Sequence, residues 1–150
     1  MAGSFTCLRY HLVFSTKDRL PRLTADTRPR LFEYFGGILR NRNGHLLAAG
    51  GTEDHIHLIA ILPRDRSVAE MLRDMKSNTS GWLNDLGLCG PDFHWQDGYG
   101  AFTVGKREVA GLQQYLAGQE EHHRERSFQE EFLAFLEEND IEYDPRYIWK

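Results

Sequence analysis

The chain has few cysteines, no long apolar run and no excess of basic charge, and each lack excludes a class of protein. Among its 150 residues only Cys7 and Cys89 are cysteines, and they show neither zinc-ligand spacing nor a disulfide framework. No uninterrupted apolar run approaches the roughly 20 residues of a membrane span, so we expect no membrane partner. No basic start precedes an apolar stretch at the N-terminus, so we expect no signal peptide and a cytoplasmic location.

The net charge of −4 at first argues against nucleic acid as a partner. The charges are unevenly distributed, however. Residues 1–42 carry eight Lys and Arg against three Asp and Glu, whereas residues 106–150 carry six against eleven. This asymmetry permits a basic face for a phosphate backbone, although two ordinary solvated faces would give the same counts.

Repeats, low-complexity segments and linkers are also lacking, and 41% hydrophobic residues suit one globular domain over residues 1–150. Strand patterns occur at 8–16, on both sides of Gly50-Gly51-Thr52 within 45–62, and at 101–104. Helix patterns occur at 24–43, 67–87, 106–124 and 127–140, and Ser67 and Ser127 each begin a capping box. This order predicts an α+β fold, an antiparallel sheet with helices packed on one face.

The segment "DHIHL" (54–58) places two histidines in one of the predicted strands. Residues i and i+2 of a strand point to the same side, so His55 and His57 present their rings together. Two imidazoles held in this way can ligate one divalent metal ion. A solvated sheet face would accommodate the same pair, and Asp54 either shapes the turn or holds a histidine ring.

The segment "QQYLAGQEEHH" (113–123) offers a possible nucleophile on a predicted helix. Tyr115 and Gln119 are one turn apart on one face, and His122 and His123 follow on the next turn. A phenol with a pKa of about 10 is a poor nucleophile unless its target is activated, and a divalent metal ion supplies that activation at a phosphoryl group. Alternatively, Tyr115 packs into the core and Gln119 is merely exposed.

The segment "FHWQDGYGAF" (93–102) concentrates aromatic residues in a predicted loop. Trp95 and Tyr99 can stack on unpaired bases there, although such a loop more often covers the core. Lys76, on the polar side of the preceding helix, can contact phosphate or solvent equally well.

Four of these segments, in this order, resemble the small HUH single-tyrosine transposases of bacterial insertion sequences and the related REP-associated tyrosine transposases. "TEDHIHLIAILP" resembles the family's histidine strand, and "MLRDMKSNTSGWLND" resembles the next helix, with its lysine at Lys76. "FHWQDGYGAFTV" resembles the aromatic loop and strand, and "VAGLQQYLAGQEEHHRERSFQEEF" resembles the tyrosine helix. Gly118 departs from the asparagine expected there, and loosens the helix between Tyr115 and Gln119.

The resemblance implies a ferredoxin-like sheet, Mg²⁺ or Mn²⁺ held by His55, His57 and Gln119, and Tyr115 as nucleophile. The tyrosine would attack a DNA phosphodiester to give a 5′-phosphotyrosine and a free 3′-hydroxyl, and reversal would rejoin DNA. The implied partners are single-stranded DNA with hairpin ends and a second copy of the chain in a homodimer. When bound to DNA, the protein would be associated with the bacterial nucleoid. The candidate DNA contacts are Arg9, Lys17, Arg19, Lys76, Trp95, Tyr99 and His123. Two other functions stay open: a domesticated hairpin-binding protein without cleavage, and a metal-dependent phosphoesterase that activates water.

Overall fold

The computed structural model describes residues 3–149, except for the side chains of residues 124 and 125. Within these residues four strands and five α-helices follow one another, with short 3-10 turns at Lys17–Arg19 and Lys106–Glu108. The elements are β1 (Leu8–Ser15), α1 (Thr27–Asn41), β2 (His45–Gly51), β3 (His55–Leu62), α2 (Val68–Leu86), β4 (Gly100–Thr103), α3 (Val109–Ala117), α4 (Gln119–Glu125) and α5 (Phe128–Glu138). None of the helices in this described part is long and apolar enough to cross a membrane.

The four strands form one antiparallel sheet in the order β2-β3-β1-β4. Because β1-α1-β2-β3-α2-β4 is the ferredoxin-like succession, the predicted α+β fold is confirmed. Strands β1 and β3 occupy the centre; β3 is buried along nearly its whole length, and β1 is buried from His11 to Ser15. Side chains on both faces of these two strands are therefore covered.

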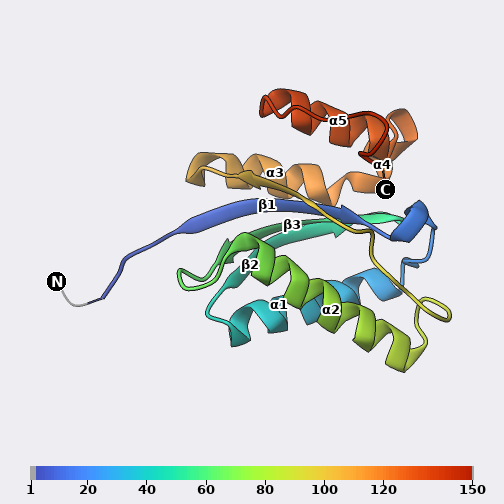
Figure 1. The fold of residues 1–150 in the computed structure, drawn as a ribbon, viewed down its shortest axis with the longest axis horizontal. Coiled ribbons are helices and arrows are strands. Elements are labelled where there is room, and N and C mark those ends of the chain that lie inside the picture. Colours follow the sequence, from blue (N-terminus) through green and yellow to red (C-terminus); the bar gives the residue numbers. More distant parts are fainter. Residues whose placement is uncertain (1–2, 150) are drawn as a thin grey trace.

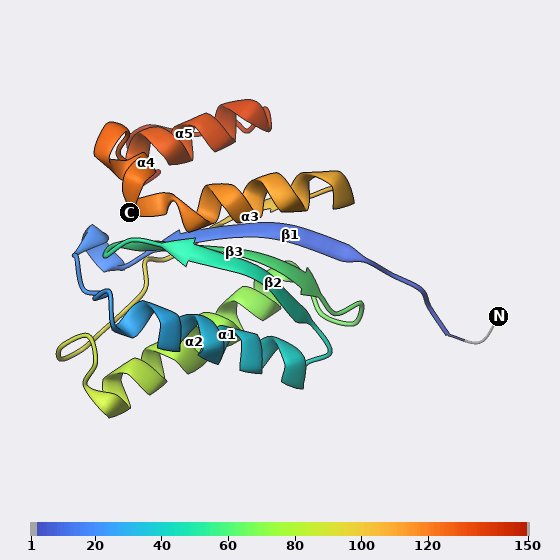
Figure 2. The ribbon, with the colours of Figure 1, turned by 180° about the vertical axis from the view of Figure 1, so that it is seen from behind.

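The helices cover both faces of the sheet and not one, as Figures 1 and 2 show. Helices α1 and α2 form the predicted layer and enclose the larger core, which includes Phe14, Phe35 and Met75. Helices α3 and α5 lie over the other face, where Val13 and Phe128 belong to a second, smaller core. The order of the elements suggested one covered face. The second face presents histidines as well as apolar residues, and burial of those histidines was not evident from the sequence.

Both predicted serine caps are present, but one predicted helix is divided. Ser67 Oγ accepts a hydrogen bond from Glu70 N at 3.1 Å, and Ser127 Oγ accepts one from Glu130 N at 3.2 Å. The helix expected over 106–124 breaks at Gly118, whose φ of −100° and ψ of 19° leave the helical range. Tyr115 therefore lies on α3, and Gln119 begins a separate short helix.

Candidate active site

The two histidines of β3 point toward α5 from the centre of the sheet. Their ring centroids are 5.2 Å apart, and neither side chain is accessible to solvent. Such burial is costly for an imidazole unless each ring nitrogen has a polar partner. The identity of those partners therefore determines the chemistry of the site.

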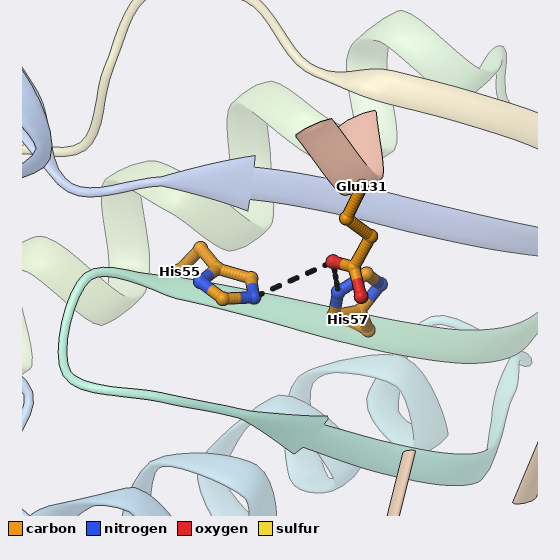
Figure 3. Close-up of side chains that lie close together, drawn as sticks. All are labelled: His55, His57 and Glu131. Carbon is orange, nitrogen blue, oxygen red and sulfur yellow. Dashed lines mark hydrogen bonds and ion pairs between the residues drawn. The ribbon is translucent and has the colours of Figure 1, made fainter. Parts of the chain in front are cut away.

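A carboxylate from α5 provides the central partner, as Figure 3 shows. Glu131 Oε1 lies 2.8 Å from His57 Nε2 and 3.7 Å from His55 Nε2. One ligand atom from each of these three buried residues lies within 4.8 Å of the others, a spacing compatible with a shared metal ion. Glu131 was not predicted from the sequence. The available signal was its position three residues after Phe128 and four before Phe135, on the apolar stripe of an otherwise acidic helix.

Gln119, the predicted third ligand, lies in the same group. Its Oε1 is 3.0 Å from His55 Nε2 and 3.0 Å from His123 Nε2, and its amide Nε2 donates to Glu131 Oε2 at 3.2 Å. Like Glu131, Gln119 is almost fully buried. The break at Gly118 starts α4 at this residue, so its side chain enters the histidine cluster.

Tyr115 reaches the cluster from α3. Its hydroxyl donates a hydrogen bond to Glu131 Oε2, and its ring stacks on His122 with centroids 4.4 Å apart. Burial, together with the hydrogen bond and negative charge of Glu131, raises the pKa of the Tyr115 phenol well above its usual range. The phenol is therefore protonated, and it contacts an acceptor for its proton.

The charges in the cluster are set by Glu131. Burial alone would raise its pKa, but hydrogen bonds from His123 and His57 outweigh burial and hold the carboxyl pKa well below its usual range. Burial would lower the pKa of His123, but its hydrogen bond to Glu131 and the charge of that carboxylate raise it. Burial lowers the pKa of His57 despite the same carboxylate. Glu131 is thus ionised, His57 is neutral, and His123 is shifted toward its charged form.

The donor set fits a divalent cation. Asp54 Oδ1 lies 2.8 Å from His55 Nδ1 and accepts its hydrogen, so Asp54 holds this ring in place. The lone pair of His55 Nε2 is then directed at Gln119 Oε1, an oxygen that also carries lone pairs. Acceptors that converge in this way need a proton or a metal ion between them. Imidazole nitrogen with carboxylate and amide oxygen suits Mn²⁺ well and Mg²⁺ less well.

A third buried histidine, His11 on β1, stands behind His57. Its Nε2 lies 2.8 Å from His57 Nδ1, and its ring packs edge-on against Phe102 and Phe135. Burial lowers the pKa of His11 to about 3, so the ring is neutral. His11 was not predicted from the sequence, because it belongs to no short motif and only the pairing of β1 with β3 brings it to His57.

Comparison with known proteins identifies the family. The family model described as "Transposase IS200 like" matches residues 4–119, which include β3 and Tyr115. This chain belongs to the IS200-like transposase family. Glu131 lies beyond the matched residues. A comparison with the curated proteins finds no significant relative.

Two solved structures resemble this chain in fold. A transposase described as putative, from Deinococcus radiodurans, is 21% identical with a TM-score of 0.61, over 79% of this chain and 95% of that chain. A REP-associated tyrosine transposase bound to a REP hairpin is 16% identical with a TM-score of 0.55, over 79% of this chain and 72% of that chain.

The candidate DNA contacts are distributed over several places in the structure. His123 belongs to the Glu131 cluster, whereas Arg9 is half-buried on β1 and Lys17 is exposed after that strand. The guanidinium of Arg19 lies 5.4 Å from the ring centroid of Trp149. The structure brings none of these three basic residues into the Glu131 cluster.

The aromatic loop separates into a core residue and a surface residue. Trp95 is only 6% exposed, and its indole N–H donates to Thr79 Oγ1 at 2.9 Å, which leaves no open ring face for a base. Tyr99 is 38% exposed and lines a cavity of about 450 Å³ with Lys76. The Lys76 ammonium donates to the carbonyl oxygens of Gln96 and Gly98 at 2.7 and 2.6 Å, so it holds the loop against α2.

Proposed function

We propose that this IS200-like transposase is a metal-dependent single-strand DNA transesterase, which nicks and rejoins DNA at hairpins through Tyr115. The observation that carries the proposal is the meeting of the Tyr115 hydroxyl, His57 and His55 at one buried carboxylate, Glu131. Tyr115 has no comparable use in a water-activating phosphoesterase. The tyrosine mechanism is therefore favoured over that alternative.

In this proposal His55 and His57 hold Mg²⁺ or Mn²⁺ together with oxygens of Gln119 and Glu131. The ion, when bound, polarises the scissile phosphate and stabilises the departing oxygen. Asp54 keeps the hydrogen of His55 on Nδ1, which leaves Nε2 free as a ligand. The amide Nε2 of Gln119, which donates to Glu131 Oε2, keeps that side chain turned with Oε1 toward His55.

As Tyr115 Oη forms its bond to phosphorus, the phenol proton passes to Glu131 Oε2, the acceptor that it already contacts, and the bond from phosphorus to the 3′-oxygen breaks. The products are a 5′-phosphotyrosine and a strand end whose 3′-oxygen takes up a proton as a hydroxyl. Attack by another 3′-hydroxyl reverses both bonds and returns the proton to Tyr115, so joining needs no external energy.

The proposed substrate is single-stranded DNA that carries a hairpin, in the bacterial cytoplasm where the nucleoid lies. Support comes from the REP-associated tyrosine transposase, which shares the fold and is bound to a REP hairpin. Arg9, Lys17, Arg19 and Lys76 are the proposed phosphate contacts, and Tyr99 is the proposed stacking residue. We keep a homodimer as the expected assembly, with residues 1–150 as one domain in each copy.

A labelled hairpin oligonucleotide, incubated with Mn²⁺ or Mg²⁺ and analysed on a denaturing gel, tests the proposal. We expect a covalent protein–DNA adduct with the unmodified protein and with Tyr143→Phe, and none with Tyr115→Phe or in EDTA. An adduct formed by Tyr115→Phe would refute the role of Tyr115. Hairpin binding that survives EDTA without any cleavage would instead identify a binding protein. Cleavage without adduct, with solvent oxygen-18 in the product, would identify a phosphoesterase.

A further inference from the structure

A cavity of about 560 Å³ lies beside β2, the strand at one end of the sheet, and its volume is typical of pockets that hold small molecules. Its lining comes from the start of α1, the end of β2 and the segment that joins α3 to α4. Helices α1 and α3 cover opposite faces of the sheet, so a cavity that both of them line lies at the outer edge of β2 (Figure 2). Leu116, which directly follows Tyr115, belongs to this lining together with Gln119. A ligand in the cavity would therefore lie next to the proposed nucleophile.

The backbone of β2 presents hydrogen-bonding groups to this cavity. Thr52 N donates to His55 O at 3.0 Å, so Thr52 directs its backbone groups toward β3. Backbone groups of an antiparallel strand point alternately toward the partner strand and away from it, so those of Ala49 and Gly51 point outward. Both residues line the cavity, and no described residue forms a hydrogen bond with them on that side. A ligand with donors and acceptors along a flat edge can therefore pair with this strand.

An ion pair between α1 and α4 adds a charged donor and a charged acceptor to the lining. The side chain of Arg28 is only 11% exposed, and its guanidinium donates to Leu23 O at 2.8 Å and to Glu120 Oε1. A guanidinium carries five N–H donors, so Arg28 has further donors for a ligand. Phe32, also on α1, contributes an aromatic ring to the same cavity.

These groups suit a nucleobase better than a phosphate. Glu120 and Glu121 both line the cavity, and their carboxylates would repel a phosphate. A base is uncharged, stacks on aromatic rings and is recognised through the donors and acceptors along its edges when it is unpaired. The neighbouring guanidinium and carboxylate therefore select for a base.

We propose that this cavity is the subsite for one unpaired guanine of the DNA strand beside the scissile phosphate, and that Arg28 and Glu120 select that base. The inference rests on the proposed function, since Tyr115 determines where the scissile phosphate lies. Guanine offers two acceptors, O6 and N7, to Arg28 and two donors, its N1 hydrogen and N2 amino group, to Glu120. O6 and N1 are adjacent in guanine, so the two side chains can remain paired. Adenine has an amino group in place of O6, and this group would face the donors of Arg28.

NMR of nitrogen-15-labelled protein, titrated without metal with dGMP, dAMP, dCMP, dTMP or inorganic phosphate, tests the subsite. We expect dGMP to shift the backbone amide signals of Ala49 and Gly51 at concentrations about 5- to 100-fold lower than the other nucleotides require. Phosphate should leave these two signals unchanged. Equal shifts with all four nucleotides, shifts with phosphate, or no shift with dGMP would each overturn the proposal.

Two variants test the selecting residues. Arg28→Lys keeps the charge beside Glu120 but loses the planar fork of donors, so we expect the preference for dGMP over dAMP to fall about fivefold or more. Arg30→Lys is the control, because Arg30 lies on the same helix outside the cavity lining, and it should keep the preference. Glu120→Gln alters a side chain that is 68% exposed, so it spares the fold and should also lower the preference. An unchanged preference in folded Arg28→Lys, or in Glu120→Gln, would overturn the proposal.

The titration involves no cleavage, so its result is separate from that of the adduct assay. Adduct formation without a dGMP shift would refute the guanine subsite and leave the proposed function standing. A selective dGMP shift without any adduct would refute the proposed function and leave a guanine site in a protein that does not cleave DNA. Signals of Ala49 and Gly51 that follow the protein concentration instead of dGMP would place a second copy against β2, and would overturn the subsite.

Discussion

Replacing Gly50 by alanine should displace the helix that carries the nucleophile. Gly50 lies on β2 opposite His57 of β3, and α3 packs directly on this part of the sheet. A Cβ at position 50 would lie 2.4 Å from the carbonyl oxygen of Leu116 and 2.9 Å from its Cβ. The obstacle is backbone, which a side-chain rotation cannot remove, so α3 must move.

The size of the effect follows from that contact. Cβ atoms essentially never approach within 3.0 Å, so α3 must shift by at least about 0.6 Å, and Tyr115 is the residue next to Leu116. Overpacking of this kind costs about 1–3 kcal/mol of stability. Since a misplacement of about 1 Å can cost about 100-fold in rate, we expect adduct formation to slow by about 10- to 100-fold.

Gly111→Ala is the matched control, because Gly111 lies on the same helix and a Cβ there meets no atom within 4 Å. We expect this control to form the adduct at the normal rate and to gain about 0.5–1 kcal/mol of stability, since alanine favours a helix. Urea denaturation and the time course of the adduct on a denaturing gel measure the two effects. If Gly50→Ala matches the unmodified protein in both measurements, α3 does not position Tyr115 through this contact.

Two pairs of substitutions test the DNA surface and the cap of α5. Tyr99→Ala should weaken binding of a single-stranded oligonucleotide by about 1–3 kcal/mol without loss of stability, which fluorescence anisotropy measures. Trp95→Ala should instead destabilise the core by about 3–5 kcal/mol, which thermal melting measures. Ser127→Ala and Ser67→Ala should each cost about 1 kcal/mol of stability, but only Ser127→Ala should weaken Mn²⁺ binding, because its helix carries Glu131. Equal Mn²⁺ affinity in the two serine variants would contradict the role of α5.

The sequence was sufficient for the elements whose signal is local. The apolar run after the turn at Gly50-Gly51-Thr52 predicted β3, the spacing of two residues predicted the common face of His55 and His57, and the Ser-x-x-Glu patterns predicted two helix starts. A continuous helix was predicted over 106–124, across Gly118, because helix propensity alone makes one glycine only mildly unfavourable within a helix. In the structure the break at Gly118 begins a separate helix at Gln119, and Gln119 contacts both His55 and Glu131.

The residues that the sequence missed depend on packing between distant segments. His11 reaches His57 because β1 pairs with β3, and Glu131 reaches both histidines because α5 lies over the second face of the sheet. Neither contact has a fixed spacing along the chain. A carboxylate on the apolar stripe of α5 was a usable signal, however, since burial of an unpaired charge is costly and therefore indicates partners.

The two roles proposed for Glu131 can be separated by one substitution. Glu131→Gln keeps the shape of the side chain but removes the charge that binds metal and the oxygen that takes the Tyr115 proton. We expect Mn²⁺ affinity to fall at least about tenfold, a loss that excess Mn²⁺ can overcome. If the carboxylate also accepts the Tyr115 proton, adduct formation by Glu131→Gln at saturating Mn²⁺ should remain about 100- to 10,000-fold slower than in the unmodified protein.

Glu130→Gln is the control for this experiment, because Glu130 is the preceding residue of α5 and is exposed. It should leave both Mn²⁺ affinity and the rate unchanged. Full recovery of the Glu131→Gln rate at saturating Mn²⁺ would leave Glu131 as a ligand only, and another group would have to accept the phenol proton. Unchanged Mn²⁺ affinity with a slow rate would have the opposite meaning. His55, His57 and Gln119 would then hold the ion, and Glu131 would serve the tyrosine alone.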